Sequence, residues 1–217
     1  MKRTQKLIWL FAILLFLGSS VTSFAQPLKD VFNNSESSLT YLGIDFSKAR
    51  LLDIGNPDDI RNRLYASINE LIVTEPKKFD LQGAFRKSNI EHDFSAVTKN
   101  NAKVNPNDIL STSSADFNKF KEADINGIVK SLDLAGKDGI GLLFVMEAMR
   151  KADKKGDAAI WVTLVDMKTK KVLMTERIEA KASTAIGFRN FWASTIKNLI
   201  DEIDKKKYKE WKSKYSS

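Results

Sequence analysis

Residues 139–183, GIGLLFVMEAMRKADKKGDAAIWVTLVDMKTKKVLMTERIEAKAS, decide the fold because they read as three successive β-strands. The first expected strand, Gly141 to Met149, is almost wholly apolar, and the second, Ala158 to Met167, is apolar on both faces. Successive side chains of a strand point to opposite faces of a sheet. An apolar run on both faces therefore predicts strands that are covered on both sides.

The third expected strand, Lys171 to Ser183, alternates more clearly between apolar and polar residues, which predicts a half-exposed strand. Leu173 and Glu176 break the alternation. The polar segment 168–170 before it predicts a hairpin with the second strand. The expected buried face of the third strand comprises Val172, Met174, Ile178 and Ala180.

Upstream of this unit, Leu39 to Phe46 reads as a strand, and residues 57–73 read as a helix. Asn56 suits the N-cap of that helix and Pro57 its first position, and apolar residues follow at helical spacing. Together with the three-strand unit, this pattern predicts an α/β fold, with α+β as the alternative. We expect a single mixed β-sheet flanked by amphipathic helices.

The remaining segments predict shorter elements. We expect a short helix at Phe79–Lys87, a strand near Phe94–Val97 and a helix within Asp116–Leu134. The polar stretch Asn100–Asp116 predicts a surface excursion, a kind of loop that often carries function. From Gly187 onward, apolar residues at helical spacing predict an amphipathic helix that packs on the sheet.

The first 25 residues have the composition of a secretory signal peptide. A basic head precedes the apolar run LIWLFAILLFL, and small residues lead to Ala25. That run is shorter than the roughly 20 residues that span a bilayer, so we expect cleavage, not an anchor. The protein is thus expected in the periplasm or outside the cell. Because it contains no cysteine, we do not expect a lipoprotein.

Cleavage after residue 25 would lower the formal net charge from +8 to +5, and residues 204–217 carry +4 of that. The body is therefore almost neutral, and we expect no nucleic-acid partner. The expected organisation is an extended lead-in at 26–38, one domain at 39–203 and a basic tail at 204–217.

The tail interleaves lysines with aromatic residues, a composition that could contact an anionic surface or a partner protein. The alternative is a soluble helix end whose lysines suit the negative C-terminal end of the helix dipole. The candidate contact residues are Lys205, Lys206, Lys207, Tyr208, Lys209, Trp211 and Lys212.

Catalytic signatures are sparse. His92 is the only histidine, so a multi-histidine zinc site is excluded, and no phosphate-binding or dinucleotide-binding glycine motif occurs. Asp45 and Asp53 lie near the carboxyl end of the first expected strand, where α/β sheets often bind ligands. Asp45 is equally explained as a strand-end residue that accepts hydrogen bonds from nearby amides. We expect no cofactor.

Three stretches resemble the periplasmic α/β domain shared by curli-secretion-channel-like and TolB N-terminal-like envelope proteins. They are Leu42–Phe46, Gly139–Val145 and Ile160–Met174, and the last is similar to the family's hairpin with Lys170 in place of a turn glycine. The resemblance would cover about residues 39–203. It implies an envelope domain without catalytic residues, and the missing cysteine departs from the lipoproteins of the family.

These observations lead to one hypothesis and two alternatives. The main hypothesis is an exported, non-catalytic envelope domain that binds or scaffolds another envelope protein. One alternative is an envelope hydrolase that uses a carboxylate pair around Asp45, and the other is a peripheral binder of anionic surfaces through the tail. The oligomeric state does not follow from the sequence.

Overall fold

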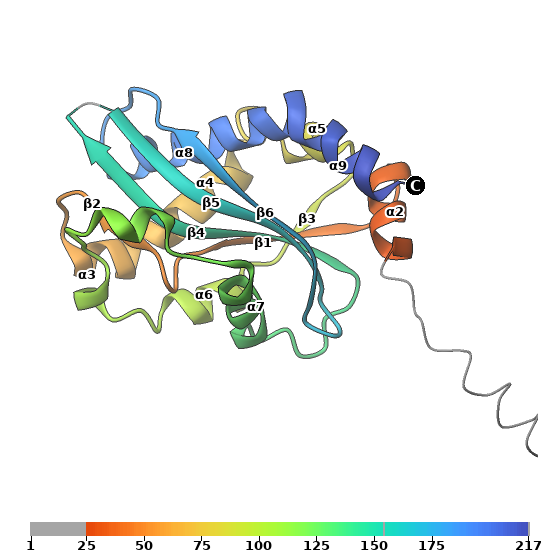
Figure 1. Ribbon diagram of the computed structural model, residues 1–217, viewed down its shortest axis with the longest axis horizontal. Helices are drawn as coiled ribbons and strands as arrows, with labels where there is room; N and C mark the ends of the chain where they lie inside the picture. Colours follow the sequence, from red (N-terminus) through yellow and green to blue (C-terminus); the bar gives the residue numbers. More distant parts are fainter. Residues whose placement is uncertain (1–24, 154, 217) are drawn as a thin grey trace, which may run out of the picture.

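A mixed sheet of six strands lies between two layers of helices in the computed structural model, which describes residues 25–153 and 155–216 (Figure 1). The strand order is β3-β1-β4-β5-β6, and β2 pairs with β4 beyond the end of β1. The strands are β1 Leu39–Asp45, β2 Arg50–Leu52, β3 Glu91–His92, β4 Ile140–Ala152, β5 Lys155–Asp166 and β6 Lys171–Lys181.

Two long helical segments each consist of two α-helical pieces joined by a π-helical turn. One runs through α3, η1 and α4, and the other through α8, η4 and α9. The helical elements are α2 Ala25–Asn33, α3 Pro57–Asp59, η1 Ile60–Leu64, α4 Tyr65–Thr74, α5 Leu81–Phe85, α6 Ser95–Asn101, η2 Pro106–Asp108, η3 Ser114–Asn118, α7 Glu122–Ser131, α8 Phe188–Glu202, η4 Ile203–Lys207 and α9 Tyr208–Tyr215. No helix among the described residues is both long and apolar enough to cross a membrane.

The predicted fold class and three-strand unit are confirmed. β4 pairs in parallel with β1 and antiparallel with β5, and β5 pairs antiparallel with β6. From Gly141 to Met149 every residue of β4 is buried, as expected for a strand with a helical layer on each face. The helix predicted at 57–73 is confirmed as α3 to α4, with Asn56 accepting hydrogen bonds at its N-cap.

The predicted face of β6 is wrong at one residue. Leu164 pairs with Met174 and Val165 pairs with Val172, so Leu173 is an extra residue at a β-bulge. The bulge turns Val172 to the opposite face of the sheet from Met174. The broken alternation at Leu173 was thus the sequence signal of this bulge.

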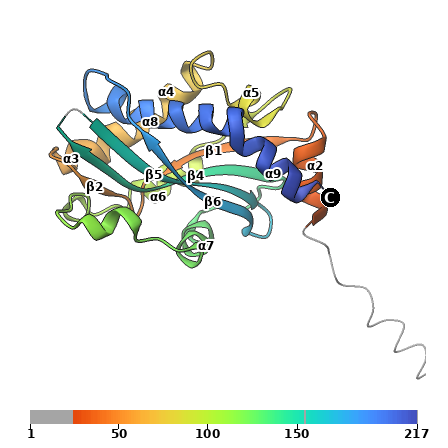
Figure 2. The same cartoon turned by 45° about the horizontal axis from the view of Figure 1, so that its top comes forward.

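The two faces of the sheet bury separate cores. The larger core lies on the side of α4, α5, α8, α9 and α2, whereas the smaller one lies on the side of α6 and α7 (Figure 2). Trp192 of α8 is 1% exposed in the larger core, and Ile125 of α7 is 0% exposed in the smaller. These helices show the predicted amphipathic packing.

The expected extended lead-in at 26–38 is wrong, because α2 occupies most of it. Leu28, Val31 and Phe32 share one face of this helix and are buried, and α2 packs against α9. At the carboxyl end of α2, the carbonyls of Val31 and Asn34 accept hydrogen bonds from Lys87 Nζ at 2.5 Å and 2.7 Å. The remainder of the predicted signal peptide, residues 1–24, lies outside the described residues.

The strand expected near Phe94–Val97 is also wrong, because Ser95 begins helix α6. Asp93 lies before the N-cap residue Phe94 and accepts a hydrogen bond from the Ser95 N–H at 2.9 Å, as aspartates do in local turns. A run this short does not distinguish strand from helix by periodicity. The expected excursion that follows is partly built into the sheet, since Leu51 of β2 donates its N–H to Ile109 O at 2.8 Å.

Candidate functional site

A polar cleft of 860 Å³ opens at the carboxyl end of β1. Its walls are the turn after β1, the end of α6 with the segment that follows, residues 119–120 and the outer side of α7. Ligands of α/β proteins commonly bind beyond the carboxyl ends of strands. The cleft therefore opens where the sequence analysis placed a candidate ligand site, although neither Asp45 nor Asp53 is among the residues that line it.

Asp45 lies beneath the cleft and is fully buried. Its carboxylate accepts hydrogen bonds from Ser47 N–H (2.8 Å), Ser47 Oγ (2.5 Å) and Asn100 Nδ2 (2.7 Å). Burial raises the pKa of this carboxyl, and the hydrogen bonds from Ser47 and Asn100 offset part of that rise. All three donors belong to the protein, so Asp45 acts as the strand-end acceptor that the sequence allowed as an alternative.

Side-chain amides replace a neighbouring strand beside the last residues of β1. Gly43, with φ of 95°, sits at a register shift in β1, and β3 pairs only with the residues before it. Past this point Asn69 Oδ1 accepts the N–H of Ile44 at 2.7 Å, and Asn101 Oδ1 accepts the N–H of Phe46 at 2.7 Å. The amides thus satisfy backbone groups on the edge of β1 that β3 does not reach, while the other edge of β1 stays paired with β4 as far as Asp45.

The wall at residues 119–120 is fixed by a buried carboxylate. Glu147 is 1% exposed and accepts the N–H groups of Lys119 (2.5 Å) and Phe120 (2.7 Å). Its other oxygen accepts Trp161 Nε1 at 3.0 Å and Arg177 Nε at 2.7 Å. Four donors thus converge on one side chain, which joins the wall of the cleft to three strands of the sheet.

Positive charge predominates around the cleft. Six ionisable side chains line it, four cationic and two acidic, which leaves a net charge of +2. The two acids are already engaged, since Asp108 lies 3.9 Å from an arginine and Asp124 accepts the Lys121 N–H at 2.8 Å. The cleft is therefore suited to an anionic group. The cations are Lys48, Arg50, Lys103 and Lys119.

Asp53 does not share this site with Asp45. Asp45 pairs with Val145 of β4, whereas Leu52, just before Asp53, pairs with Arg150. At about 3.3 Å per residue these registers put Leu52 about 17 Å from Asp45, and Asp53 lies one residue beyond, too far for a carboxylate pair. Asp53 instead lies 3.8 Å from Lys151 Nζ. Asp53 is therefore not the second member of a carboxylate pair with Asp45.

The expected tail is part of the folded domain. Tyr208 and Trp211 are buried in the larger core, and the Tyr208 hydroxyl donates to Phe32 O at 3.0 Å. Lys207 pairs with Glu176 of β6 at 2.6 Å, and Trp211 Nε1 donates to the same carboxylate at 2.5 Å. Of the seven candidate contact residues, four are exposed: Lys205, Lys206, Lys209 and Lys212.

His92 is exposed on the short edge strand β3. Its ring lies 5.3 Å from the ring of Phe94, centroid to centroid, in a tilted arrangement. Over the ranges 25–153 and 155–216, no three histidine, aspartate or glutamate side chains gather as a metal site would require.

No family model matches this sequence and no curated protein does either, so the envelope-domain resemblance stays a prediction. Three solved structures show limited likeness. A hypothetical protein of Chlamydia trachomatis is 10% identical with a TM-score of 0.34, and the match covers 83% of this chain and 96% of that one. A lipoprotein of Neisseria meningitidis is 14% identical with a TM-score of 0.29, and the match covers 76% of this chain and 99% of that one.

For a neuraminyllactose-binding hemagglutinin homolog of Helicobacter pylori the identity is 10% and the TM-score 0.31, over 84% of this chain and 90% of that one. All three TM-scores lie below 0.5, so none of these proteins assigns a function to this chain.

Proposed function

We propose that this chain is an exported, non-catalytic binding module of the cell envelope, which holds an acidic segment of a partner protein in the polar cleft. The excess of cationic side chains around the cleft carries the proposal. Two of them, Lys48 and Lys103, are exposed and lie on separate walls, so a carboxylate between them would meet positive charge from both sides.

The state of the buried groups favours binding over catalysis. The three hydrogen bonds to Asp45 come from Ser47 and Asn100. The four hydrogen bonds to Glu147 come from two backbone N–H groups, a tryptophan and an arginine, all of this chain. Neither carboxylate projects into the cleft as a general base would have to do. What the walls offer to a ligand is their positive charge and backbone polar groups.

The test is the affinity of the mature chain, from Gln26, for a fluorescein-labelled hexaglutamate peptide, measured by anisotropy. At about 10 mM salt charges act over about 30 Å, so the electrostatic contribution is large. The double variant Lys48→Glu/Lys103→Glu should bind at least tenfold more weakly, equivalent to about 1.4 kcal/mol.

A matched control carries the same change of charge elsewhere. Lys209→Glu/Lys212→Glu alters two exposed lysines of α9 and should leave the affinity within about twofold, since the packed face of the helix is unchanged. Equal losses in the two double variants would show that only net charge matters, and this would refute the cleft as the site.

The same pair of variants decides a second candidate function, peripheral binding to anionic surfaces through α9. Lys205, Lys209 and Lys212 recur at helical spacing on the exposed side of η4 and α9. If this face carries the function, the α9 double variant should lose binding to vesicles that contain anionic lipid, and the cleft variant should keep it.

Export is tested separately on the protein isolated from its source cells. Sequencing of its amino terminus should begin at Gln26 if the leader is removed as the sequence predicts. A chain that begins at Met1 would contradict both cleavage and the exported location proposed here.

A further inference from the structure

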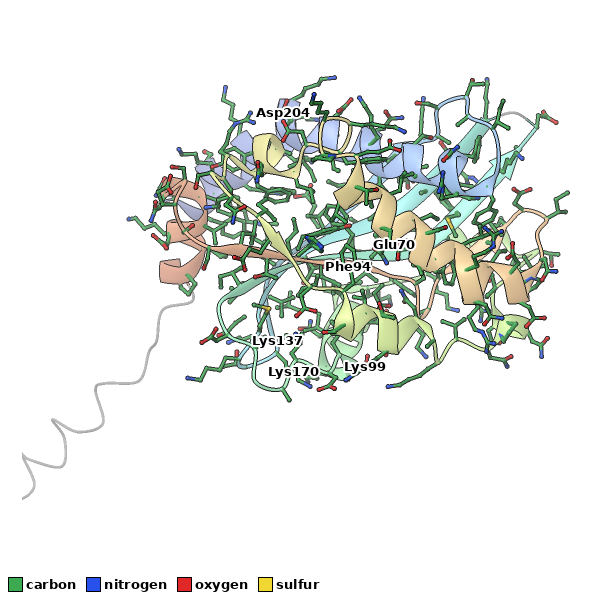
Figure 3. The ribbon with its side chains drawn as sticks, turned by 180° about the vertical axis from the view of Figure 1, so that it is seen from behind. Glu70, Phe94, Lys99, Lys137, Lys170 and Asp204 are labelled. Carbon is green, nitrogen blue, oxygen red and sulfur yellow. The ribbon has the colours of Figure 1, made fainter. Side chains whose placement is uncertain are left out.

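The outer edge of β3 is unpaired in the part of the chain that the structure describes, because β3 ends the strand order. Asp93 donates its N–H to Tyr41 O at 3.0 Å, and alternate residues of a strand direct their backbone groups to alternate sides. The N–H and C=O of His92 therefore point away from β1. Figure 3 shows β3 on the near side, without another ribbon along its outer edge.

Two pockets flank this strand, one on each face of the sheet. The edge pocket, of 490 Å³, lies on the α4–α5 side and includes Ile90 and His92. The acidic pocket, of 540 Å³, lies on the opposite side and includes Glu91 and Asp93. His92 lines both pockets, whereas Ile90 lines only the edge pocket and Glu91 and Asp93 line only the acidic one, broadly as the alternation of side chains along a strand requires. A strand added beside β3 would direct its own side chains to the same two faces in turn.

The edge pocket suits a side chain with an apolar body and a polar tip. Tyr41 lines it, and the Tyr41 hydroxyl is buried without a hydrogen-bond partner among the described residues. A buried hydroxyl without a hydrogen-bond partner is unfavourable. A hydroxyl on an incoming side chain would satisfy it. The apolar lining is Ile72, Val73, Pro76, Phe79, Leu81 and Ile90.

The acidic pocket has the opposite character. Glu91, Asp93 and Asp138 line it together with one lysine, Lys137, which is hydrogen-bonded to Asp93. One ion pair leaves two carboxylates in excess, and Glu91 and Asp138 are both exposed. A lysine or arginine side chain would complement this charge.

We propose that an extended segment of a partner protein adds to β3 as a further strand, with an aromatic hydroxyl side chain in the edge pocket and a basic side chain in the acidic pocket. The unpaired backbone of His92 supplies main-chain hydrogen bonds, and the two pockets supply specificity, the division of roles typical of strand addition. This site is separate from the polar cleft and does not depend on its function.

The test uses a labelled hexapeptide that alternates tyrosine and lysine, titrated against the mature chain and followed by anisotropy and by backbone amide shifts. We expect saturable binding with shifts at residues 90–93 and at Tyr41. A peptide that alternates tyrosine and glutamate should bind at the β3 edge at least tenfold more weakly, as judged by the amide shifts at residues 90–93, because the peptide and the acidic pocket are both negative.

Two pairs of variants separate the parts of the proposed site. Glu91→Lys should weaken binding of the tyrosine–lysine peptide at least fivefold, whereas Glu70→Lys, an exposed change on α4 (Figure 3), should leave it unchanged. His92→Pro removes the outward N–H at a position where an edge strand tolerates proline. It should weaken binding more than His92→Ala, which keeps the N–H.

Tyr41→Phe should change the stability of the free protein and its affinity for the peptide in opposite directions. Loss of the unsatisfied hydroxyl should raise the thermal midpoint of the free protein and lower its affinity for the tyrosine–lysine peptide. A two-residue strand is also a common protection of a sheet edge against association. Absence of saturable binding, or equal binding by the folded His92→Pro and His92→Ala variants, would overturn the proposal in favour of that protective role.

Discussion

Replacement of Glu147 by leucine should produce one of the largest losses of stability available in this protein. The side chain is 1% exposed in β4, at a bulge opposite β5, and accepts hydrogen bonds from four donors. Leucine has a similar size but no acceptor. The change therefore leaves the Arg177 guanidinium without its buried counter-ion and two backbone N–H groups unpaired.

The expected magnitude follows from these losses. Removal of one partner of a buried ion pair costs about 3–5 kcal/mol. For a domain of this size about 1 kcal/mol corresponds to about 2–4 °C in Tm, so Glu147→Leu should lower Tm by about 6–20 °C. Urea titration followed by tryptophan fluorescence measures the free energy of unfolding directly.

Two further variants separate the buried carboxylate from general effects. Glu179 pairs with the same arginine but its side chain is 56% exposed, so Glu179→Leu should cost less than about 1 kcal/mol. The double variant Glu147→Leu/Arg177→Met should be less destabilised than the sum of its single changes, because neither charge remains unpaired. Additive losses, or a loss below about 1 kcal/mol for Glu147→Leu, would refute this account of the network.

Three other predictions concern stability and protonation. Trp211→Ala should cost about 3–5 kcal/mol in urea unfolding, because this residue of the expected tail is 2% exposed in the larger core. Burial raises the pKa of Asp45 in the folded state. The contribution of Asp45 to stability is therefore present below pH about 4 and is lost as the pH rises through the folded-state pKa. Asp45→Asn should remove this dependence of the free energy of unfolding on pH, as measured by urea titrations at several pH values. Lys137→Met should return the pKa of Asp93 from about 2 towards the usual value near 3.8, as a carboxyl NMR titration would show, because the hydrogen bond from Lys137 is the largest cause of its lowering.

Much of the fold was predictable because strand and helix patterns here coincide with burial. The run from Gly141 to Met149 is apolar on both faces, and the structure covers it on both faces. The errors concern two short helices, α2 and α6, whose sequences are too short for hydrophobic spacing to identify them as helical. α2 was missed because its apolar stripe is short and its packing partner, α9, lies at the other end of the chain. α6 was missed because it is only seven residues long and no side chain caps its start at Phe94, so the sequence carries no capping signal there.

The candidate cleft opens at the end of the sheet that Asp45 marks in the sequence, but its lining was not predictable. Whether a ligand binds at this end of the sheet stays a prediction. The cationic residues around the cleft come from segments far apart in the sequence, and only the folded chain brings them together. Glu147 did leave a signal, since it is the one charged residue within the apolar run of its strand.

The packing of α2 against α9 has a consequence for the order in which this chain can fold. The hydrogen bond from Tyr208 to Phe32 joins residues 176 positions apart, so α2 acquires its packing partner from a segment far along the sequence. Loop closure over so long a separation is slow. Until α9 is made and docked, Leu28, Val31 and Phe32 lack the helix that packs against them in the folded domain. The larger core is therefore completed only after α9 has been synthesised.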